Sequence, residues 1–503
     1  MHRSKRLLIL VGVLAVVCAA AFLATRVQEQ QEQVEASGET VLAIDAGNVA
    51  SLAWTSGEAE YAFHKDGTWI YDADEAFPVS AEALEELLAP FSSFNAAFVI
   101  RDVTDYAQYG LEEPECTIEI GTADASYTIA LGDMSAMDDQ RYVSIGDDNV
   151  YLAVTDPMDA FAVELSDLID NDEIPQMDTV TALSLTGAVE ESIAYVEAGG
   201  PSYSDEDVYF LQSGEESLPL DTDLVEDYLG GIRSLVLTDY ATYNATEIEL
   251  ASFGLNDPAL TVTVEYEQQA EAAEEGAEPE TTAGALALHI GRVEEAEESA
   301  EETAESAEDI SQEEAQYAYY LRVGDSQIVY NLSDADGEAL FAASYDDLRH
   351  RQLFWGDFDD VAQATILLDN QTYTLTAQTA ETAETADAAA AEEPAGSAEP
   401  TAAAEDDAEI TWTCNGETVD VTGIRDKLAA LTAEAFTEEA PADQLEISLA
   451  LDLNDEDVPQ VRIQLYRYDG ASCLAVLDGE PAALVAREDV VDLMEAIRTL
   501  LLG

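Results

Sequence analysis

Apolar and polar residues alternate with a period of two along many short stretches of this chain. Thr117–Ile120 reads TIEI and Thr261–Val264 reads TVTV, so every second side chain is suited to a core. This period, with its β-branched residues, is typical of half-buried antiparallel strands. Asp-Gly, Ser-Gly and Asn-Gly pairs at 66–67, 213–214 and 415–416 fit two-residue hairpin turns. The pattern therefore predicts sheets built from hairpins.

Longer segments of helical character lie between these strands. Strands joined by hairpins, with two helices per unit, predict an α+β architecture with mostly antiparallel sheets. The predicted helices are Ser80–Phe94, Asp156–Ile169, Asp221–Arg233, Ser333–Leu348, Thr422–Leu431 and Glu488–Leu502.

One phrase occurs twice in the chain. Tyr109–Ile120 reads YGLEEPECTIEI, and 144 residues later Phe253–Val264 reads FGLNDPALTVTV. From Gly146 to Gly324, in a second matching strand pair, the spacing grows to 178 residues. Two low-complexity insertions, 267–283 and 294–315, lie between the second phrase and Gly324. Their 39 residues nearly equal the extra 34. These agreements predict a duplicated domain.

The repeated phrase has the residue types of a structural corner. Glycine permits a positive φ, leucine can fill a core, and proline suits the position just before a strand. The two positions before the proline, Glu112-Glu113 in one copy and Asn256-Asp257 in the other, do not keep an acidic residue at both places, so we expect no catalytic role. The predicted structural corners are Gly110, Leu111, Pro114, Gly254, Leu255 and Pro258.

Three stretches contain almost only Ala, Glu, Thr, Asp, Gln, Ser, Gly and Pro. They are residues 267–283, 294–315 and 377–408. With almost no large apolar residues they cannot offset the entropy of ordering, so disordered insertions at hairpin tips are predicted.

The resulting domain organisation has an anchor, a linker and three repeat units. The third unit lacks the corner phrase and is the most diverged copy. The predicted boundaries are 1–26 for a cytoplasmic stub and transmembrane anchor, 27–40 for a linker, 41–175 for unit 1, 178–357 for unit 2 and 360–503 for unit 3.

The N-terminus indicates export. Basic residues precede an unbroken apolar run from Leu7 to Ala24, longer than the core of an ordinary signal peptide. This predicts a single-pass transmembrane helix in a bacterial cell membrane, with the C-terminal bulk extracytoplasmic. A cleaved signal peptide is the alternative. Lipidation of Cys18 is disfavoured because Val17, which is not a small residue, precedes it.

The charge of the chain excludes some partners. With 107 acidic and 18 basic residues the formal net charge is -89, which repels nucleic acid and anionic membrane surfaces. A solvated exported surface explains so much acid, and weak cation binding is the alternative. The remaining cysteines, Cys116, Cys414 and Cys473, lie in apolar strand-like contexts and are predicted to be buried free thiols. A Cys414–Cys473 bridge stays open.

A search for catalytic and metal-binding patterns predicts none. The histidines, His2, His64, His289 and His350, are scattered without metal-ligand spacing, and the nucleophile and phosphate-loop motifs are absent. The Asp334–Leu340 stretch has a D-x-D-G core but lacks the other oxygen ligands of an EF-hand. Ser333 before it is predicted to cap a helix. No catalytic, cofactor or metal residue is therefore assigned.

The chain resembles the bacterial domain of unknown function family 4340. The resemblance is carried by the anchor, by DGTWIY at Asp66–Tyr71, by the phrases ending in Pro114 and Pro258, and by the strand pair at Tyr142–Val154. It implies a membrane-tethered companion of ABC exporters of the gliding-motility type and gives no catalytic residue.

Two functions follow as hypotheses. The first is a non-enzymatic extracytoplasmic scaffold or accessory protein with an ABC transporter permease as partner. The alternative is a surface adhesin or receptor for glycans, peptides or cations.

Overall fold

The computed structural model describes residues 39–502, apart from 58, 137–138, 198–199, 215, 270–280, 295–315, 379–409, 443 and 456–457. The predicted anchor and nearly all of the predicted linker lie outside the described residues, as do most of the three predicted insertions. Within the described part of the chain, no helix has the length and apolar character needed to cross a membrane.

The protein is mostly β, so the α+β prediction is wrong. Strands hold 45% and helices 21% of the described residues, in three antiparallel sheets of nine strands each. Two differences from the prediction shift the balance from helix to strand. The prediction missed a strand after the first helix of each repeat, and two predicted helices are broken into short turns.

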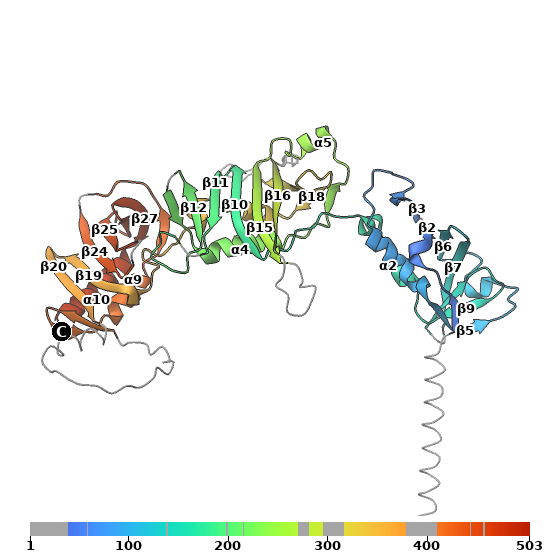
Figure 1. The fold of residues 1–503 in the computed structure, drawn as a ribbon, viewed down its shortest axis with the longest axis horizontal. Helices are drawn as coiled ribbons and strands as arrows, with labels where there is room; N and C mark the ends of the chain where they lie inside the picture. The colour runs from blue at the N-terminus through green and yellow to red at the C-terminus, as the bar shows by residue number, and fades with distance from the viewer. Residues whose placement is uncertain are drawn as a thin grey trace, which may run out of the picture. The chain divides into compact units, whose positions relative to one another are not determined.

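The chain divides into two compact units (Figure 1). One contains the residues up to Glu173 together with Tyr240–Ala245, and the other contains Ile174–Asp239 and the residues from Thr246 onward. The first sheet lies in the first unit, and the third sheet and most of the second lie in the second unit.

The first sheet has the strand order β1-β5-β9-β8-β7-β6-β2-β3-β4. Its central strands β2 and β6 pair along their length, with Trp54 opposite Ile118. The strands are β1 Glu39–Leu42, β2 Val49–Ser56, β3 Ala59–Asp66, β4 Thr68–Tyr71, β5 Phe94–Ile100, β6 Cys116–Thr122, β7 Ser126–Met134, β8 Arg141–Ser144 and β9 Val150–Ala153.

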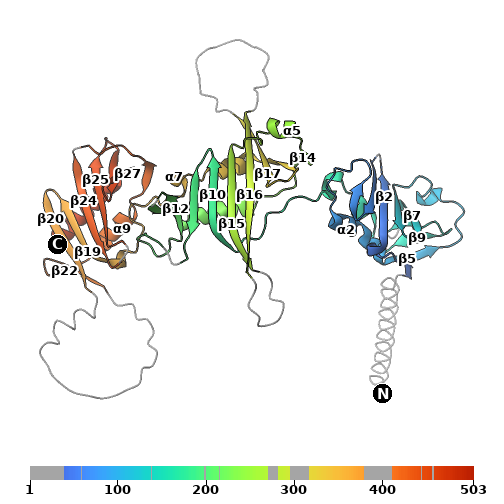
Figure 2. The ribbon, with the colours of Figure 1, turned by 45° about the horizontal axis from the view of Figure 1, so that its top comes forward.

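The second sheet has the strand order β13-β12-β11-β10-β15-β16-β17-β18-β14. Its longest strands, β15 and β16, lie side by side (Figure 2). The strands are β10 Thr179–Gly187, β11 Glu191–Tyr195, β12 Tyr209–Ser213, β13 Glu216–Pro219, β14 Tyr240–Thr242, β15 Leu260–Gln269, β16 Thr281–Glu294, β17 Tyr317–Val323 and β18 Val329–Leu332.

The third sheet has the strand order β22-β21-β20-β19-β24-β25-β26-β27-β23 and so follows the second strand for strand. In both sheets, the first four strands pair in chain order and lead to one edge. The strand that follows the next helix, β14 or β23, forms the other edge. The strands are β19 Val361–Leu368, β20 Gln371–Gln378, β21 Thr411–Cys414, β22 Glu417–Val419, β23 Ala433–Phe436, β24 Leu445–Leu453, β25 Gln460–Arg467, β26 Ser472–Leu477 and β27 Glu480–Ala486.

A helix follows the first hairpin ladder of each sheet. The helices α2 (Ala81–Ser92) and α4 (Thr222–Arg233) begin at Ser80 and Asp221, whose side chains accept hydrogen bonds from the first turn. The third is α9 (Thr422–Ala429), and α10 (Arg487–Leu502) closes the chain on β26 and β27.

Two predicted helices are interrupted. Asp156–Ile169 contains only α3 (Met158–Phe161) and the 3-10 turn η3 (Leu165–Leu168). Ser333–Leu348 splits into α6 (Asp334–Phe341) and α7 (Tyr345–Leu348). In each, a new capping box begins the second piece, at Glu164 and at Ser344, because these side chains bond backbone N–H groups and compete with a continuous helix. The short helix α5 (Glu247–Ser252) and the 3-10 turns η1 (Ala46–Asn48), η2 (Ala107–Tyr109) and η4 (Phe358–Asp360) complete the elements.

The alternating pattern places one face of each strand in a core. In β15, Val262 and Val264 are fully buried, whereas Thr261 and Thr263 between them are half-buried on the opposite face. Burying a valine side chain contributes about 1.5–3 kcal/mol, so this alternation fixes the register of the sheet.

The strands that flank the predicted insertions are hairpin partners. Gln269 pairs with Thr281, Glu294 with Tyr317, and Gln378 with Thr411. The predicted position at hairpin tips is therefore confirmed. The predicted limits were wrong by a few residues, because residues 267–269, 281–283, 294 and 377–378 belong to strands.

Candidate functional site

The two corner phrases have the same backbone course. Gly110 has a φ of 69° and Gly254 a φ of 70°, in the left-handed region that favours glycine. Leu111 and Leu255 follow and are buried, at 8% and 4% exposure. Pro114 and Pro258 are half-buried, each two residues before a strand, β6 or β15.

A second pair of glycines, Gly132 and Gly291, lets each corner approach the neighbouring strand closely. A Cβ at Gly132 would lie 2.2 Å from the carbonyl oxygen of Tyr109, and one at Gly291 would lie 1.9 Å from that of Phe253. The corner and the neighbouring strand can therefore approach only because both glycines lack a side chain. The sequence prediction did not include Gly132 and Gly291.

A buried arginine supports the first corner. Arg141 is 7% exposed, and its Nε donates to both carboxylate oxygens of Asp156 at 2.8 and 2.9 Å. Its Nη1 donates to Glu115 Oε2 and to the carbonyl oxygen of Gly132, both at 2.6 Å. The guanidinium charge is paired and its N–H groups are hydrogen-bonded, so the free-energy cost of burying Arg141 is offset. This cluster is structural.

A buried polar cluster surrounds His350 in the second unit, on the segment that leads from the second sheet to the third. His350 Nε2 lies 2.8 Å from Oδ1 of Asp207, whose side chain is 2% exposed. On the other side of the ring, Nδ1 lies 3.5 Å from Oδ2 of Asp221. The indole of Trp355 stacks on the imidazole, with centroids 4.5 Å apart and planes 10° apart.

The Asp207 carboxylate accepts hydrogen bonds from three side chains. Besides His350, Trp355 Nε1 donates to its Oδ2 at 2.9 Å, and the hydroxyl of Ser202 donates to the same oxygen. These donors replace the water that burial removes from the carboxylate.

The geometry at His350 does not form a nucleophile–base pair. A general base must accept the proton of a nucleophile, but the Ser202 hydroxyl donates to Asp207. His350 Nε2 also faces that carboxylate, which as an anion can only accept. The cluster therefore acts as a clamp. It holds the segment that enters the third sheet, where Leu353 and Phe354 are buried in the core.

An open pocket of about 630 Å³ adjoins this clamp. Its walls are rich in carboxylates, so it favours cations over anions. The acidic and basic side chains that line it are Glu206, Asp207, Asp221, Asp223, His350 and Arg351.

The other described histidines lie far from these carboxylates in the sequence and have single polar partners. His64 is 48% exposed and pairs with Asp72 at 2.5 Å. His289 lies 3.2 Å from the hydroxyl of Thr261, and its pKa is lowered by burial and by the nearby charge of Arg322. His2 lies outside the described residues.

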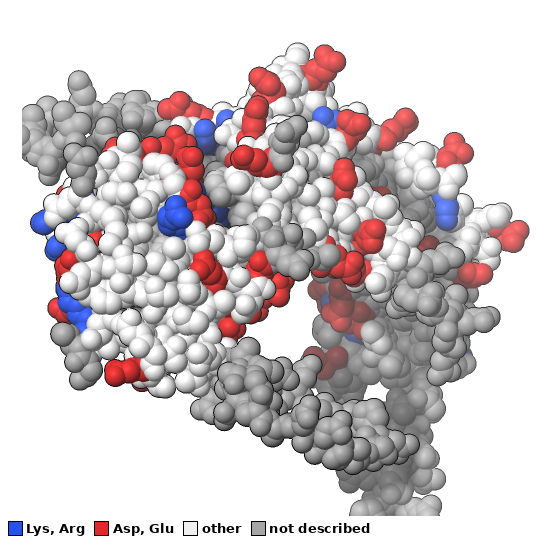
Figure 3. All heavy atoms as spheres, turned by 60° about the vertical axis from the view of Figure 1, so that its left-hand side comes forward, with Lys and Arg blue, Asp and Glu red and all other residues white. Residues whose placement is uncertain are grey.

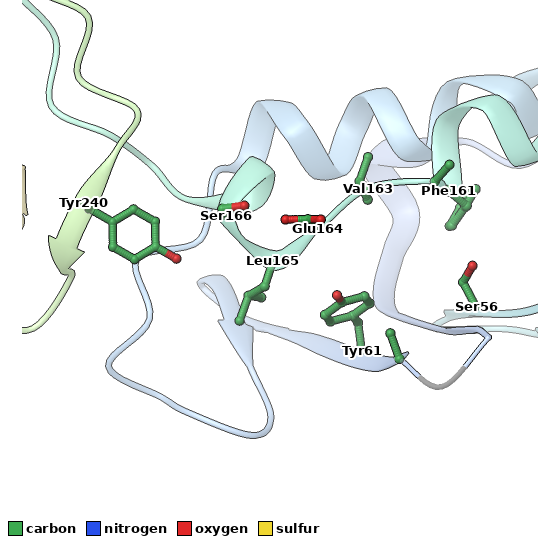
Figure 4. A pocket seen from close by; sticks show the side chains of 10 residues that line it. Ser56, Tyr61, Phe161, Val163, Glu164, Leu165, Ser166 and Tyr240 are labelled. Carbon is green, nitrogen blue, oxygen red and sulfur yellow. The ribbon is translucent and has the colours of Figure 1, made fainter. Parts of the chain in front are cut away.

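A second pocket, of about 560 Å³, lies in the first unit. Tyr61, Phe161 and Tyr240 contribute aromatic rings to it, and Glu164 contributes a carboxylate (Figure 4). Beneath it, the buried ring of Trp54 contacts Tyr61 and Phe161 at centroid distances of 5.0 and 5.5 Å. Rings with one acidic group could hold a sugar or an amine.

No group of three or more His, Cys, Asp or Glu side chains in the described part of the chain is arranged to hold a metal ion. The EF-hand-like stretch forms helix α6 instead, and Ser333 caps it by accepting the N–H of Asp336 at 3.1 Å. The predicted cap is confirmed.

Cys116, Cys414 and Cys473 are free and buried, as predicted, so the Cys414–Cys473 bridge is not formed. Burial raises the pKa of Cys116 and of Cys473 to about 11, which disfavours the reactive thiolate.

Sequence reasoning missed the clamp because its members are far apart in the chain. His350 is 143 residues from Asp207, and single Asp residues carry no signal in so acidic a sequence. The segment Leu348–Trp355 was nevertheless visible, since two arginines, a histidine and a tryptophan occur together there in a chain poor in basic residues.

Comparison with known proteins gives one family. Residues 69–248 match the model of the domain of unknown function family 4340. This confirms the family inferred from the sequence, over most of the first repeat and the start of the second. No curated protein and no solved structure matches the chain.

Proposed function

We propose that this chain is a non-enzymatic scaffold at the outer face of a bacterial cell membrane, where it assembles with a membrane protein such as an ABC transporter permease. The observation that carries the proposal is the clamp of His350 and Asp207. A buried His–Asp contact ties the second repeat to the segment that leads into the core of the third sheet, so this polar cluster supports assembly of the repeats.

The surface also supports a scaffold role. Asp and Glu side chains gather in separate groups on the face seen in Figure 3, with wide uncharged areas between them. Repeated units that present extended sheet surfaces are suited to binding large partners. The net charge of -89 favours a partner with basic surface segments.

The proposed location rests on the sequence. The apolar run Leu7–Ala24 would hold the chain in the membrane, and the basic residues before it would keep the N-terminus in the cytoplasm. Replacing Leu14 and Ala15 by Arg would move the chain from the membrane fraction to the soluble fraction. Leu14→Ile with Ala15→Val is the matched control and should stay in the membrane fraction.

The partner is tested by purification in mild detergent followed by mass spectrometry of co-eluting proteins. We expect a transporter permease in stoichiometric amount, and its loss in the Leu14→Arg, Ala15→Arg variant. A chain that purifies alone under several detergents would contradict the scaffold proposal.

The pocket of the first unit favours a second candidate, a receptor for glycans, peptides or cations. A glycan array and calorimetry with Ca²⁺ would detect saturable binding. Tyr61→Ala should then weaken binding of a sugar or amine, while Tyr127→Ala, on another strand of the same sheet, should leave it unchanged. Absence of saturable binding by all ligand classes would exclude this candidate.

A further inference from the structure

Each sheet has an outer corner, defined as its last hairpin strand and the turn that leads into the following helix. The corner of the first sheet is formed by β4 and residues 72–80. Within the first unit, Tyr243 lies on it. Its hydroxyl donates to Asp74 at 2.6 Å, and its ring packs edge-on against Phe77 at 5.1 Å. A side chain from later in the chain therefore occupies this corner.

The outer corner of the second sheet is formed by β13 and residues 220–221, and it is also occupied. His350 and Trp355 lie in the pocket beside Asp221, the residue that caps α4. Pro219 of β13 and Phe436 of β23 line a common small cavity, with the guanidinium of Arg349 3.5 Å from the Phe436 ring centroid. The occupant is thus a segment that combines basic and aromatic side chains.

The outer corner of the third sheet is formed by β22 and residues 420–421. Asp420 lies one residue before Val421, the N-cap of α9, whereas Asp221 is itself the N-cap of α4. Each carboxylate accepts the N–H of the residue two positions later. Beside this corner is a pocket of about 350 Å³ lined by Trp412, Val419 and Asp420.

Two properties fit this pocket to an extended basic segment. β22 pairs with β21 and forms an edge of the third sheet, so its other side can receive a strand. Around the pocket, Arg425 faces Asp359 at 3.1 Å and Asp357 at 3.7 Å, and Asp420 adds a third carboxylate. Carboxylates outnumber the cation, so a positively charged side chain is favoured there.

We propose that the outer corner of the third sheet binds an extended segment of another protein, carrying basic and aromatic side chains as Arg349–Trp355 does at the second sheet. A second copy of this chain is not the occupant. Its own Leu353 and Phe354 are 2% and 5% exposed, and two chains of net charge -89 repel each other. The proposal rests on the proposed scaffold function in one respect, because both require a protein partner.

The test uses a fluorescein-labelled peptide with the sequence of residues 348–356 and the full chain in detergent micelles. Fluorescence anisotropy should show saturable binding. Asp420→Asn can still accept the N–H of Thr422 but removes the charge, and should weaken binding about tenfold. Asp227→Asn, an exposed site on α4, is the matched control and should bind as wild type. A peptide with Ala at the His350 and Trp355 positions should also bind about tenfold more weakly.

The binding site is located by a photoreactive phenylalanine at the Trp355 position of the peptide. Crosslinks should map to residues 410–425. Absence of binding, equal binding by Asp420→Asn, or crosslinks confined to residues 204–223 would overturn the proposal. The peptide assay needs no transporter, so the peptide can bind even if no permease co-purifies. Likewise, a permease can co-purify even if the peptide does not bind.

Discussion

Four glycines show how strongly single residues determine the corners. Gly110 and Gly254 share a positive φ, but their surroundings differ. A Cβ at Gly110 would lie 2.5 Å from the Asp133 side chain, whereas one at Gly254 meets nothing closer than 3.5 Å. Gly291 has the tightest constraint, a carbonyl oxygen at 1.9 Å. The sequence pattern identified the conformational glycines but not the glycines required by close approach.

These differences predict an order of stability among alanine variants. Gly254→Ala should lower the free energy of unfolding by about 1 kcal/mol through backbone strain, and Gly110→Ala by more, because it adds a clash. Gly291→Ala should be the most destabilised. Gly230→Ala, in helix α4 with open space around it, should be neutral or gain up to about 1 kcal/mol. Denaturant unfolding measures all four. Equal losses at 110, 254 and 230 would contradict the corner assignment.

The buried thiols predict a pH dependence. The folded-state pKa of Cys116 and Cys473 is about 11, above the ordinary value of 9.0. The unfolded thiols therefore ionise first as the pH rises, and unfolding releases protons between about pH 9 and 11. The stability that these thiols contribute is complete below pH 9 and is lost as the pH rises through 11.

Thiol reactivity checks this prediction. In a Cys18→Ser background at pH 8, Ellman's reagent should find no fast-reacting thiol in the native protein and three after unfolding. A fast native reaction at Cys116 or Cys473 would show that the burial is wrong.

Among the elements, hairpins were easier to predict than helix lengths. Strand alternation and Gly-containing turns are local, so the corner strands and hairpins agree with the sequence pattern. The helices predicted at 156–169 and 333–348 break because capping side chains at Glu164 and Ser344 compete with the helical hydrogen bonds. The strand β5 and the edge strands β14 and β23 were missed because their strand partners come from distant parts of the chain.

The hairpin of β15 and β16 predicts that its insertion is dispensable for folding. Joining Gln269 to Thr281 by Asn-Gly keeps the observed register and shortens the loop, so stability should change by less than about 1 kcal/mol. Thermal unfolding measures the effect. As a control, deleting Thr263 shifts the register by one residue and takes Val264 out of the core, which should unfold the sheet. A large loss on removing residues 270–280 would give the insertion a structural role.

In the whole molecule, the third sheet and most of the second are parts of one compact unit. Leu353 and Phe354 from the connecting segment enter the third core, and Tyr203 of the second repeat packs against the same core. We therefore expect both sheets to unfold in one cooperative transition.

His350→Ala should weaken this coupling. It removes one of the three hydrogen-bond donors to the buried Asp207, which should cost about 1–3 kcal/mol. His64→Ala removes an exposed His–Asp contact and should cost at most about 1 kcal/mol. Urea unfolding of the two variants compares them directly. Similar small losses would mean that the clamp does not hold the two sheets together.

The sequence by itself determined the repeated strand pattern, the hairpin turns, the corner glycines and the family match, because these depend on local spacing. Only the tertiary structure decided that the protein is mostly β, that Gly132 and Gly291 permit the corners, and that His350 meets Asp207 and Asp221. The physical reason is that sheet edges and buried polar contacts join residues distant in sequence. In a chain with 107 acidic residues, no local signal marks the few carboxylates that find such partners.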